Sequence, residues 1–334
     1  MNPDEMRIIA GNSHPVLAKL IADYLKVPLT DSKIDRFENG EVHVQIMENV
    51  RRRTAVIIQT GYGWDQPKCS INDHIMELLI TVDALRRSSV DEIWAVIPNY
   101  PYARQDKKDV SRAPISGGLL ARLLEEAGVT RVITLELHAS QISGFFRIPV
   151  DNLYAVKSIS DYINQTLLQN LGPDERQNIV IVSPDAGGIK RMDNLAARLS
   201  LSTVIMHKSR NHQEKSMVTN TVLVGAENCV RGKKCLIVDD MCDTAGTIIK
   251  AAETLMEHGA ASVSIVVIHG ILSGPAIQRI NSANFITDVY VTNSIPQEEH
   301  VKLCPKLRVI DISQVLAEAV KRLYTGESIS GMFV

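Results

Sequence analysis

Short apolar segments alternate with amphipathic segments along most of this 334-residue chain. Their lengths and their content of β-branched residues predict strands at residues 53–60, 92–98, 131–137, 178–183, 203–207, 234–239, 262–269, 288–292 and 307–310. Apolar residues at helical spacing predict helices that include residues 116–127, 189–199 and 247–258. This alternation predicts an α/β protein whose parallel sheets carry helices on both faces.

The same plan of strand, polar or glycine-containing loop and helix occurs twice along the chain. A chain of 334 residues is long enough for two cores. We therefore predict two similar doubly wound domains with mainly parallel sheets, at residues 1–155 and 156–316. We expect the tail, residues 317–334, to pack back on the first domain.

Composition excludes several classes of protein. The net charge of -2 argues against general nucleic-acid binding, so that any anion site must be local. The five cysteines are odd in number and lack metal-type spacing, which favours reduced thiols in the cytoplasm. No apolar run reaches membrane-spanning length, and the acidic start lacks the features of a signal peptide. We expect a cytoplasmic protein with neither a nucleic-acid nor a membrane partner.

The most informative segment is residues 235–247, Cys-Leu-Ile-Val-Asp-Asp-Met-Cys-Asp-Thr-Ala-Gly-Thr. Thr244 to Thr247 would present backbone N–H groups and hydroxyls at a helix N-terminus, which suits a phosphate. Asp239 and Asp240 would repel that phosphate and suit sugar hydroxyls or a metal ion. Together they describe a ribose 5-phosphate site. The alternatives are an ordinary loop whose aspartates cap a helix, or a Walker-type loop, which is disfavoured because no Gly-Lys-Ser/Thr follows.

A basic segment follows the predicted strand at 92–98. Arg104, Lys107, Lys108 and Arg112 place four cations in nine positions. Taken alone, this pattern is typical of a solvated loop. Arg104 and Gln105 lie nearest the strand end and are best placed to reach a nucleotide phosphate and a base edge.

Two further strand ends carry candidate ligands. His138 could bind a metal ion or a phosphate, although a single histidine is often structural. Asp185 precedes Gly187-Gly188, which lets the backbone approach a pyrophosphate or Mg²⁺. The alternative for Asp185 is a helix N-cap.

Another pair of cations follows the predicted strand at 203–207. Lys208 and Arg210 would enter residues 211–220, which are polar and read as a mobile surface loop. Beside a phosphate site, two cations could neutralise the charge that develops during phosphoryl transfer.

Four blocks together carry a family resemblance. They are Pro-Tyr-Ala-Arg-Gln-Asp-Lys-Lys-Asp, Leu-His-Ala-Ser-Gln-Ile-x-Gly-Phe-Phe, Ser-Pro-Asp-Ala-Gly-Gly and Val-Asp-Asp-Met-x-Asp-Thr-x-Gly-Thr. Because it contains these four blocks in this order, the chain resembles class I phosphoribosyl pyrophosphate (PRPP) synthetases, which are also called ribose-phosphate pyrophosphokinases. The resemblance implies transfer of the β,γ-diphosphoryl group of ATP to the anomeric hydroxyl of ribose 5-phosphate, giving PRPP and AMP for nucleotide biosynthesis. A regulatory subunit with little activity of its own is the alternative; a phosphoribosyltransferase would explain only the second half.

The resemblance also implies roles for individual residues. The ATP contacts would be Phe37, Asn39, Gly40, Glu41, Arg104, Gln105, Asp106, Lys107 and Asp109. The catalytic cations would be Lys208 and Arg210. The ribose 5-phosphate contacts would be Arg210, Asp239, Asp240, Asp243, Thr244, Ala245, Gly246 and Thr247. His138 and Asp185 would organise Mg²⁺.

Regulation and assembly are implied in the same way. Inorganic phosphate would act as an activator at Arg51, Ser328 and Ser330, and subunits would form hexamers or larger assemblies, also with paralogous subunits. Three positions depart from the family pattern: Asn49 replaces a serine, Glu136 replaces an aspartate, and Arg147 stands where an acidic residue is common. The last two weaken the case for a cation site through Glu136, Arg147 and Asp151.

Overall fold

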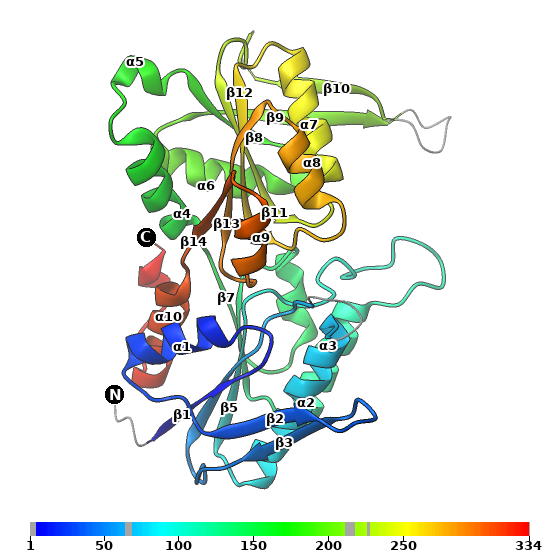
Figure 1. Cartoon of the computed structure of the whole chain (residues 1–334), viewed down its shortest axis with the longest axis vertical. Coiled ribbons are helices and arrows are strands. Elements are labelled where there is room, and N and C mark those ends of the chain that lie inside the picture. Colours follow the sequence, from blue (N-terminus) through cyan, green and yellow to red (C-terminus); the bar gives the residue numbers. More distant parts are fainter. Residues whose placement is uncertain (1–4, 64–68, 211–217, 226–227, 334) are drawn as a thin grey trace. The chain divides into compact units, whose positions relative to one another are not determined.

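The computed structural model describes residues 5–63, 69–210, 218–225 and 228–333 (Figure 1). The chain divides into two compact units. The first consists of Met1–Ala155, Asn293–Pro296 and Ile312–Val334, and the second of Val156–Thr292 and Gln297–Asp311. Both have a mainly parallel sheet, so that the predicted α/β class is confirmed.

A five-stranded parallel sheet forms the centre of the first unit. Its order is β1-β4-β5-β6-β7. The strands are β1 (Met6–Ala10), β4 (Thr54–Ile58), β5 (Glu92–Ile97), β6 (Arg131–Leu135) and β7 (Val150–Leu153). Since every neighbouring pair is parallel, the loops that follow the strands all leave from one edge.

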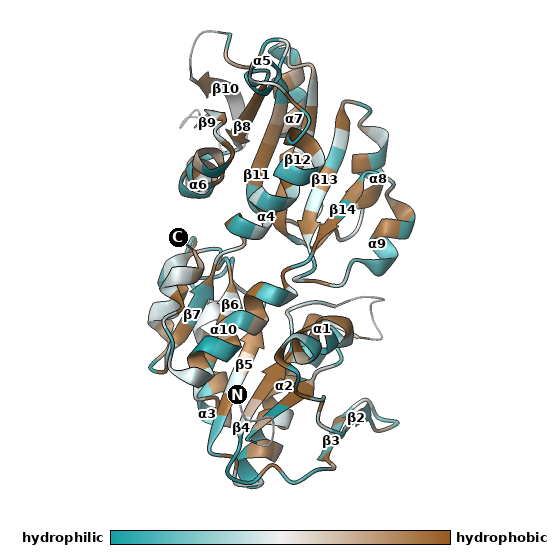
Figure 2. Ribbon diagram, turned by 90° about the vertical axis from the view of Figure 1, so that its left-hand side faces the viewer, coloured by the Kyte–Doolittle hydropathy of each residue, from teal (hydrophilic) through white to brown (hydrophobic). Residues whose placement is uncertain are grey.

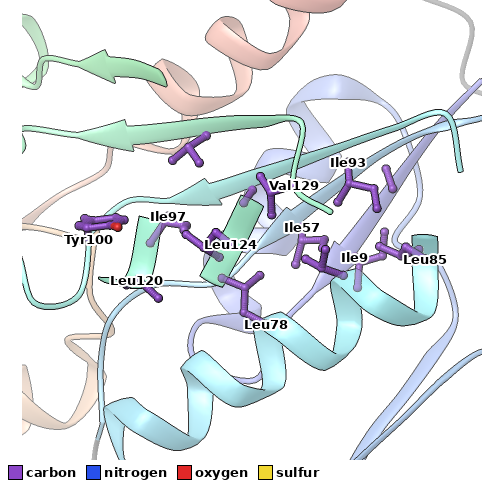
Figure 3. Close-up of a cluster of buried hydrophobic side chains, with 14 of the residues drawn as sticks. Ile9, Ile57, Leu78, Leu85, Ile93, Ile97, Tyr100, Leu120, Leu124 and Val129 are labelled. Atoms are coloured by element: carbon purple, nitrogen blue, oxygen red, sulfur yellow. The ribbon is translucent and has the colours of Figure 1, made fainter. Parts of the chain in front are cut away.

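Helices cover both faces of this sheet. On one face lie α2 (Ile71–Arg87) and α3 (Ser116–Ala127), which bury Leu78 and Leu124 against Ile57 and neighbouring side chains (Figure 3). On the other lie α1 (Pro15–Leu25) and α10 (Ser313–Thr325), which pack on each other (Figure 1). Consecutive strand residues point to opposite faces, so these short apolar strands contribute side chains to a hydrophobic core on each face of the sheet.

Two later segments of the chain belong to the first unit. In the segment Asn293–Pro296, the Asn293 carbonyl lies 2.9 Å from His14 Nε2, and the Ser294 carbonyl accepts a 2.7 Å hydrogen bond from Thr60 Oγ1. Tyr24 donates from α1 to Glu318 on α10 at 3.1 Å. The C-terminal helix is thereby held against the first one.

A two-stranded antiparallel hairpin also belongs to this unit. It consists of β2 (Ser32–Arg36) and β3 (Val42–Ile46), and β3 contacts α2. The sequence analysis placed no strand here. The hairpin residues are only half buried or exposed, so their apolar pattern is weak.

The second unit has a seven-stranded sheet in the order β10-β9-β8-β11-β12-β13-β14. Only β10 is antiparallel to its neighbour. The strands are β8 (Ile179–Ser183), β9 (Ser202–Arg210), β10 (Val218–Val224), β11 (Lys234–Cys242), β12 (Ser262–Gly270), β13 (Ile286–Thr292) and β14 (Leu307–Ile310).

Helices again lie on both faces (Figure 2). α7 (Gly246–Glu257) and α8 (Ala276–Ser282) pack together on one face, while α4 (Val156–Ile163) and α6 (Ile189–Leu199) pack together on the other. Ile248 of α7 shares a buried cluster with α8. The shorter helices are α5 (Pro173–Arg176) and α9 (Glu298–Leu303), together with a π-turn at Asn164–Leu168 and 3-10 turns at Ser140–Phe145, Ala186–Gly188 and Ser330–Met332. No helix within the described ranges has the length and apolar character needed to cross a membrane.

Several predicted strand boundaries are wrong by two or three residues, among them the ends of β4, β6 and β9. β11 continues past Asp239 to Cys242, because Met241 and Cys242 pair with β12 after β8 on its other side has ended. Residues 218–220, predicted as part of a mobile loop, begin β10, because they pair with the extended end of β9. The rest of that predicted loop, residues 211–217, lies outside the described residues.

Candidate active site

The segment after β11 forms a strand, turn and helix in the second unit. Ala245 is the N-cap of α7 and has a left-handed conformation, with φ of 61°. Its carbonyl accepts the Ile249 N–H at 2.9 Å, which closes the first helical turn. The first N–H groups of a helix have no acceptor within it, and they carry the positive end of the helix dipole. The predicted phosphate cradle at Thr244–Thr247 therefore has suitable backbone geometry.

The loop between β12 and α8 holds this cradle. Leu272 N–H donates to the Cys242 carbonyl at 2.9 Å, and Ser273 Oγ donates to Asp243 Oδ1. Arg279 Nη1 donates to the Thr244 carbonyl at 2.8 Å. The sequence analysis did not single out Leu272, Ser273 or Arg279. The available signal was the Ser-Gly-Pro-Ala turn after the strand predicted at 262–269, since parallel strands end at a common edge.

The paired aspartates lie in the last half of β11. Asp240 is buried, and its N–H donates to Asp239 Oδ1 at 2.9 Å. Burial raises the pKa of Asp239 above its ordinary value, and the negative charges of Asp240 and Asp185 raise it further. Arg191 Nη1 lies 3.9 Å from Asp239 Oδ1. Such a concentration of carboxylates favours a cation or the hydroxyl donors of a sugar.

Asp185 follows the neighbouring strand β8 and caps the 3-10 turn Ala186–Gly188. Its Oδ1 accepts the N–H groups of Gly187 at 2.8 Å and Gly188 at 3.3 Å. A Cβ at Gly188 would lie 2.6 Å from Ser183 Oγ, so a larger residue would displace that hydroxyl from its hydrogen bond to the Asp185 carbonyl. The N-cap alternative is thus present in the structure, and the same carboxylate is close enough to Asp239 to raise its pKa.

Lys208 and Arg210 lie in β9 rather than in a loop. Lys208 pairs with Thr221 and Arg210 with Val218 in the β9–β10 ribbon. The side chains of both predicted catalytic cations lie outside the described part of the structure, so their positions here are those of the backbone.

In the first unit, four of the predicted ATP contacts, Phe37, Asn39, Gly40 and Glu41, lie at the tip of the β2–β3 hairpin. Phe37 N–H donates to the Glu41 carbonyl at 2.9 Å, and Glu41 N–H to Asn39 Oδ1 at 3.1 Å. Gly40 has φ of 90°, which favours glycine. The Phe37 ring is 55% exposed, with its centroid 5.1 Å from that of His43. An exposed aromatic ring at a turn can stack on a base.

An ion pair ties the base of this tip to the start of α2. Arg36 Nη1 lies 3.0 Å from Asp73 Oδ1. Asp73 Oδ2 accepts the Ser70 N–H at 2.6 Å and the Ser70 hydroxyl at 2.7 Å. The hydrogen bonds from Ser70, followed by that from Arg36, lower the pKa of Asp73 to about 2.

The loop after β5 carries the remaining predicted ATP contacts. Arg104, Gln105, Lys107 and Asp109 are exposed, and Lys107 Nζ is 3.9 Å from Asp109 Oδ1. Asp106 differs from them, because it is buried and accepts a 2.9 Å hydrogen bond from Gln141 Nε2. Its carboxylate joins this loop to the turn after β6.

His138 is exposed just beyond β6. Nearby Glu136 is buried with φ of 46°, and its Oε1 accepts the Ala155 N–H at 3.2 Å. Asp151 Oδ2 is 2.5 Å from Arg131 Nη1, and Arg147 Nε is 2.9 Å from Glu125 Oε2. Within the described ranges, no three histidine, cysteine, aspartate or glutamate side chains gather as a metal site.

The predicted phosphate-activator residues lie on exposed segments. Arg51 N–H donates to Asn49 Oδ1 at 3.1 Å. Ser328 Oγ accepts the Ser330 N–H at 3.3 Å, and the Ser328 carbonyl accepts from Arg322 Nη1 at 3.0 Å. The contacts of Ser328 order the tail locally.

The chain has two doubly wound sheets, and in the second unit an acidic strand end lies next to the N-terminus of a helix. This arrangement defines a protein of the phosphoribosyltransferase fold type. Residues 6–128 match the N-terminal domain of ribose phosphate pyrophosphokinase, and residues 221–334 match the phosphoribosyl synthetase-associated domain. The chain belongs to the ribose-phosphate pyrophosphokinase family.

Individual relatives agree with this assignment over the full length. The chain is 47% identical to ribose-phosphate pyrophosphokinase A of Dictyostelium discoideum, over 99% of this chain and 98% of that protein. It is 48% identical to ribose-phosphate pyrophosphokinase 2 of Schizosaccharomyces pombe, over 100% and 98%. The crystal structure of phosphoribosylpyrophosphate synthetase from Mycobacterium smegmatis matches with a TM-score of 0.84 and 37% identity, over 96% of this chain and 99% of that chain. The predicted family and enzyme class are confirmed, and nothing in these relatives supports the regulatory alternative.

Proposed function

We propose that this chain makes PRPP by transferring the β,γ-diphosphoryl group of ATP to the anomeric hydroxyl of ribose 5-phosphate, with AMP as the leaving group. One observation carries the assignment of the sugar site. The acidic end of β11 leads through a left-handed Ala245 into the N-terminus of α7. The cradle at Thr244–Thr247 would take the 5-phosphate, and Asp239 and Asp240 would orient the ribose hydroxyls.

The first unit would supply the ATP contacts. Phe37 would stack on adenine at the hairpin tip, and Asn39 and Glu41 would contact the base edge. Arg104 and Gln105, exposed after β5, would contact the phosphates and nucleotide. Asp106 would act by ordering this loop, since its carboxylate already bonds to Gln141.

The residues present fit Mg²⁺ as a cofactor. Mg²⁺ is commonly bound by one or two protein carboxylates together with substrate phosphates, so a dedicated cluster is not required. Asp185 lies close enough to Asp239 to help raise the pKa of the Asp239 carboxyl, and this supports the placement of a positive charge there. His138 is a weaker candidate, because Mg²⁺ prefers oxygen ligands. When bound, Mg²⁺ would neutralise part of the charge on the transferring phosphates.

Lys208 and Arg210 would act as the catalytic cations at the transferring group. Negative charge spreads over the phosphoryl oxygens in the transition state, and positioned cations stabilise it. Both residues lie at the end of β9, and the parallel β8 and β11 end at this same edge of the sheet.

Assembly into a hexamer or a larger oligomer, also with paralogous subunits, fits an exposed apolar stripe on α1. Val16, Leu20 and Tyr24 recur every fourth residue and are 51%, 37% and 42% exposed. An apolar face of this kind suits contact with another subunit. Five free cysteines fit a cytoplasmic protein. Inorganic phosphate would be an activator through Arg51, Ser328 and Ser330.

A coupled assay of AMP release tests these assignments. Purified protein with ATP, ribose 5-phosphate and Mg²⁺ should release AMP and form PRPP, and inorganic phosphate should increase the rate. Lys208→Ala should lower turnover by about a thousandfold or more if the lysine stabilises the transition state. No turnover with Mg²⁺ and phosphate, either alone or with a sister subunit, would overturn the proposed activity.

A further inference from the structure

The loop and helix that follow β12 lie directly against the proposed 5-phosphate cradle. Ser273 binds Asp243, and Arg279 on α8 binds the Thr244 carbonyl at 2.8 Å. Both contacts join residues at least 30 positions apart in the chain. The cradle is thus held from outside its own strand-turn-helix segment.

The Thr244 carbonyl is a sensitive point of the cradle. It belongs to the peptide group whose Ala245 N–H, on the opposite side, is hydrogen-bonded to the Cys242 sulfur, so the Arg279 bond holds the other side of the same peptide. Ala245 itself is buried and left-handed at φ of 61°, a conformation that is unfavourable for a residue with a Cβ. A strained turn persists only where surrounding contacts hold it, and the Arg279 bond is one of them.

The charge of Arg279 is also placed at the cradle. A Cβ at Gly246 would lie 3.2 Å from Arg279 Nη1, so the guanidinium borders the first residue of α7. Its side chain is exposed, and within the described part of the chain it forms no ion pair with a carboxylate. This charge therefore adds to the positive end of the α7 dipole.

The short helix that carries Arg279 is firmly supported. Lys306 Nζ donates to the carbonyls of Ile280 at 2.9 Å and Ala283 at 2.8 Å, at the C-terminal end of α8. Asn281 Nδ2 donates to the Leu303 carbonyl at 2.9 Å. A well-anchored helix can hold a guanidinium at a defined place.

We propose that Arg279 is a positioning residue for ribose 5-phosphate, which holds the strained Thr244–Ala245 turn at the start of the cradle and supplies positive charge beside it. The inference rests on the proposed sugar-phosphate site. It assigns to α8 a part in recognising the phosphate and concerns the second unit alone.

The test compares Arg279→Met with Arg279→Lys and with Arg308→Met. Arg308 is a matched control, because it is a cation of the same unit that pairs with Asp288 at 3.2 Å. Arg279→Met should raise KM for ribose 5-phosphate by about tenfold or more, as expected for loss of a charged hydrogen bond. KM for ATP should change by no more than about twofold. Arg279→Lys should restore part of the lost affinity for ribose 5-phosphate, because lysine keeps the positive charge but lacks the planar guanidinium group. Arg308→Met should leave both KM values unchanged.

A binding measurement separates this inference from the proposed reaction. Thermal shifts of the full chain should be measured with ribose 5-phosphate and with ribose, which lacks the phosphate. Arg279→Met should reduce the shift given by ribose 5-phosphate and leave that given by ribose unchanged. If the wild type is active but Arg279→Met leaves KM for ribose 5-phosphate unchanged, the inference about Arg279 is wrong and the proposed function stands. An equal rise in both KM values has the same meaning. An inactive wild type overturns the proposed function instead.

Discussion

Replacing Asp73 by Asn would test whether the start of α2 holds in place the β2–β3 hairpin, which we propose to contact ATP. The substitution keeps the shape of the side chain and removes the charge that faces Arg36 at 3.0 Å. The other carboxylate oxygen accepts two hydrogen bonds from Ser70, and an uncharged amide would accept weaker ones. The variant should therefore lose both stability and affinity for ATP.

The size of the effect follows from the carboxyl pKa. Lowering it from 3.8 to about 2 corresponds to roughly 2.5 kcal/mol at about 1.4 kcal/mol for each tenfold change. The Asp73 side chain is 31% exposed, so that solvent screening reduces the expected loss to about 1 kcal/mol. Because the folded-state pKa is lowered, this stability is present above about pH 4 and is lost as the pH falls towards 2.

Denaturant unfolding at several pH values and steady-state kinetics together provide the assay. Asp73→Asn should be less stable than wild type by about 1 kcal/mol at pH 7, and the difference should shrink below pH 4. KM for ATP should rise by several-fold with KM for ribose 5-phosphate unchanged. A loss of stability that is the same at every pH, or equal changes in both KM values, would refute the reasoning.

Three further predictions concern other sites. Gly188→Ala should destabilise the chain by about 1–3 kcal/mol in denaturant unfolding, because the new Cβ would lie 2.6 Å from Ser183 Oγ. Gly144→Ala is the control, since a Cβ there would meet no atom within 4 Å. Equal losses of stability in the two variants would contradict the prediction. Burial holds the pKa of Asp239 high in the folded protein, so the Asp239 carboxyl of the unfolded chain loses its proton first as the pH rises, and the stability of wild type falls from about pH 4 towards neutrality. Asp239→Asn should therefore become increasingly stable relative to wild type over that range. A stability difference that is independent of pH would contradict this. Leu124→Ala should cost about 2–5 kcal/mol, since this side chain is fully buried; a loss below about 1 kcal/mol would show that the core closes around the gap.

The sequence predicted those elements whose signals are local. α3 and α6 begin and end where the helical spacing of apolar residues placed them, at Ser116–Ala127 and Ile189–Leu199. Nine of the twelve strands in the two sheets were found, because parallel strands covered on both faces are almost continuously apolar, whereas β1, β7 and β10 were not predicted. The β2–β3 hairpin was missed because it is only partly buried and has no such run.

Strand ends were harder to predict, because pairing decides them. β11 extends to Cys242 since β12 offers partners up to Gly270, and β10 exists because β9 continues to Arg210. Nothing in a single segment shows how long its neighbour is. Secondary structure at sheet edges is therefore a property of the sheet.

What the sequence determined by itself was the α/β class, the family and the identity of the candidate binding segments, because each rests on residues adjacent in the chain. Only the tertiary structure decided how those segments are held and charged. Arg279 reaches Thr244 across 35 positions, Arg36 reaches Asp73 across 37, and the charge of Asp185, in the turn after β8, helps to raise the pKa of Asp239. The physical reason is that hydrogen bonds and charges act over a few ångströms in space, and the order of strands in the sheet decides which distant residues come that close.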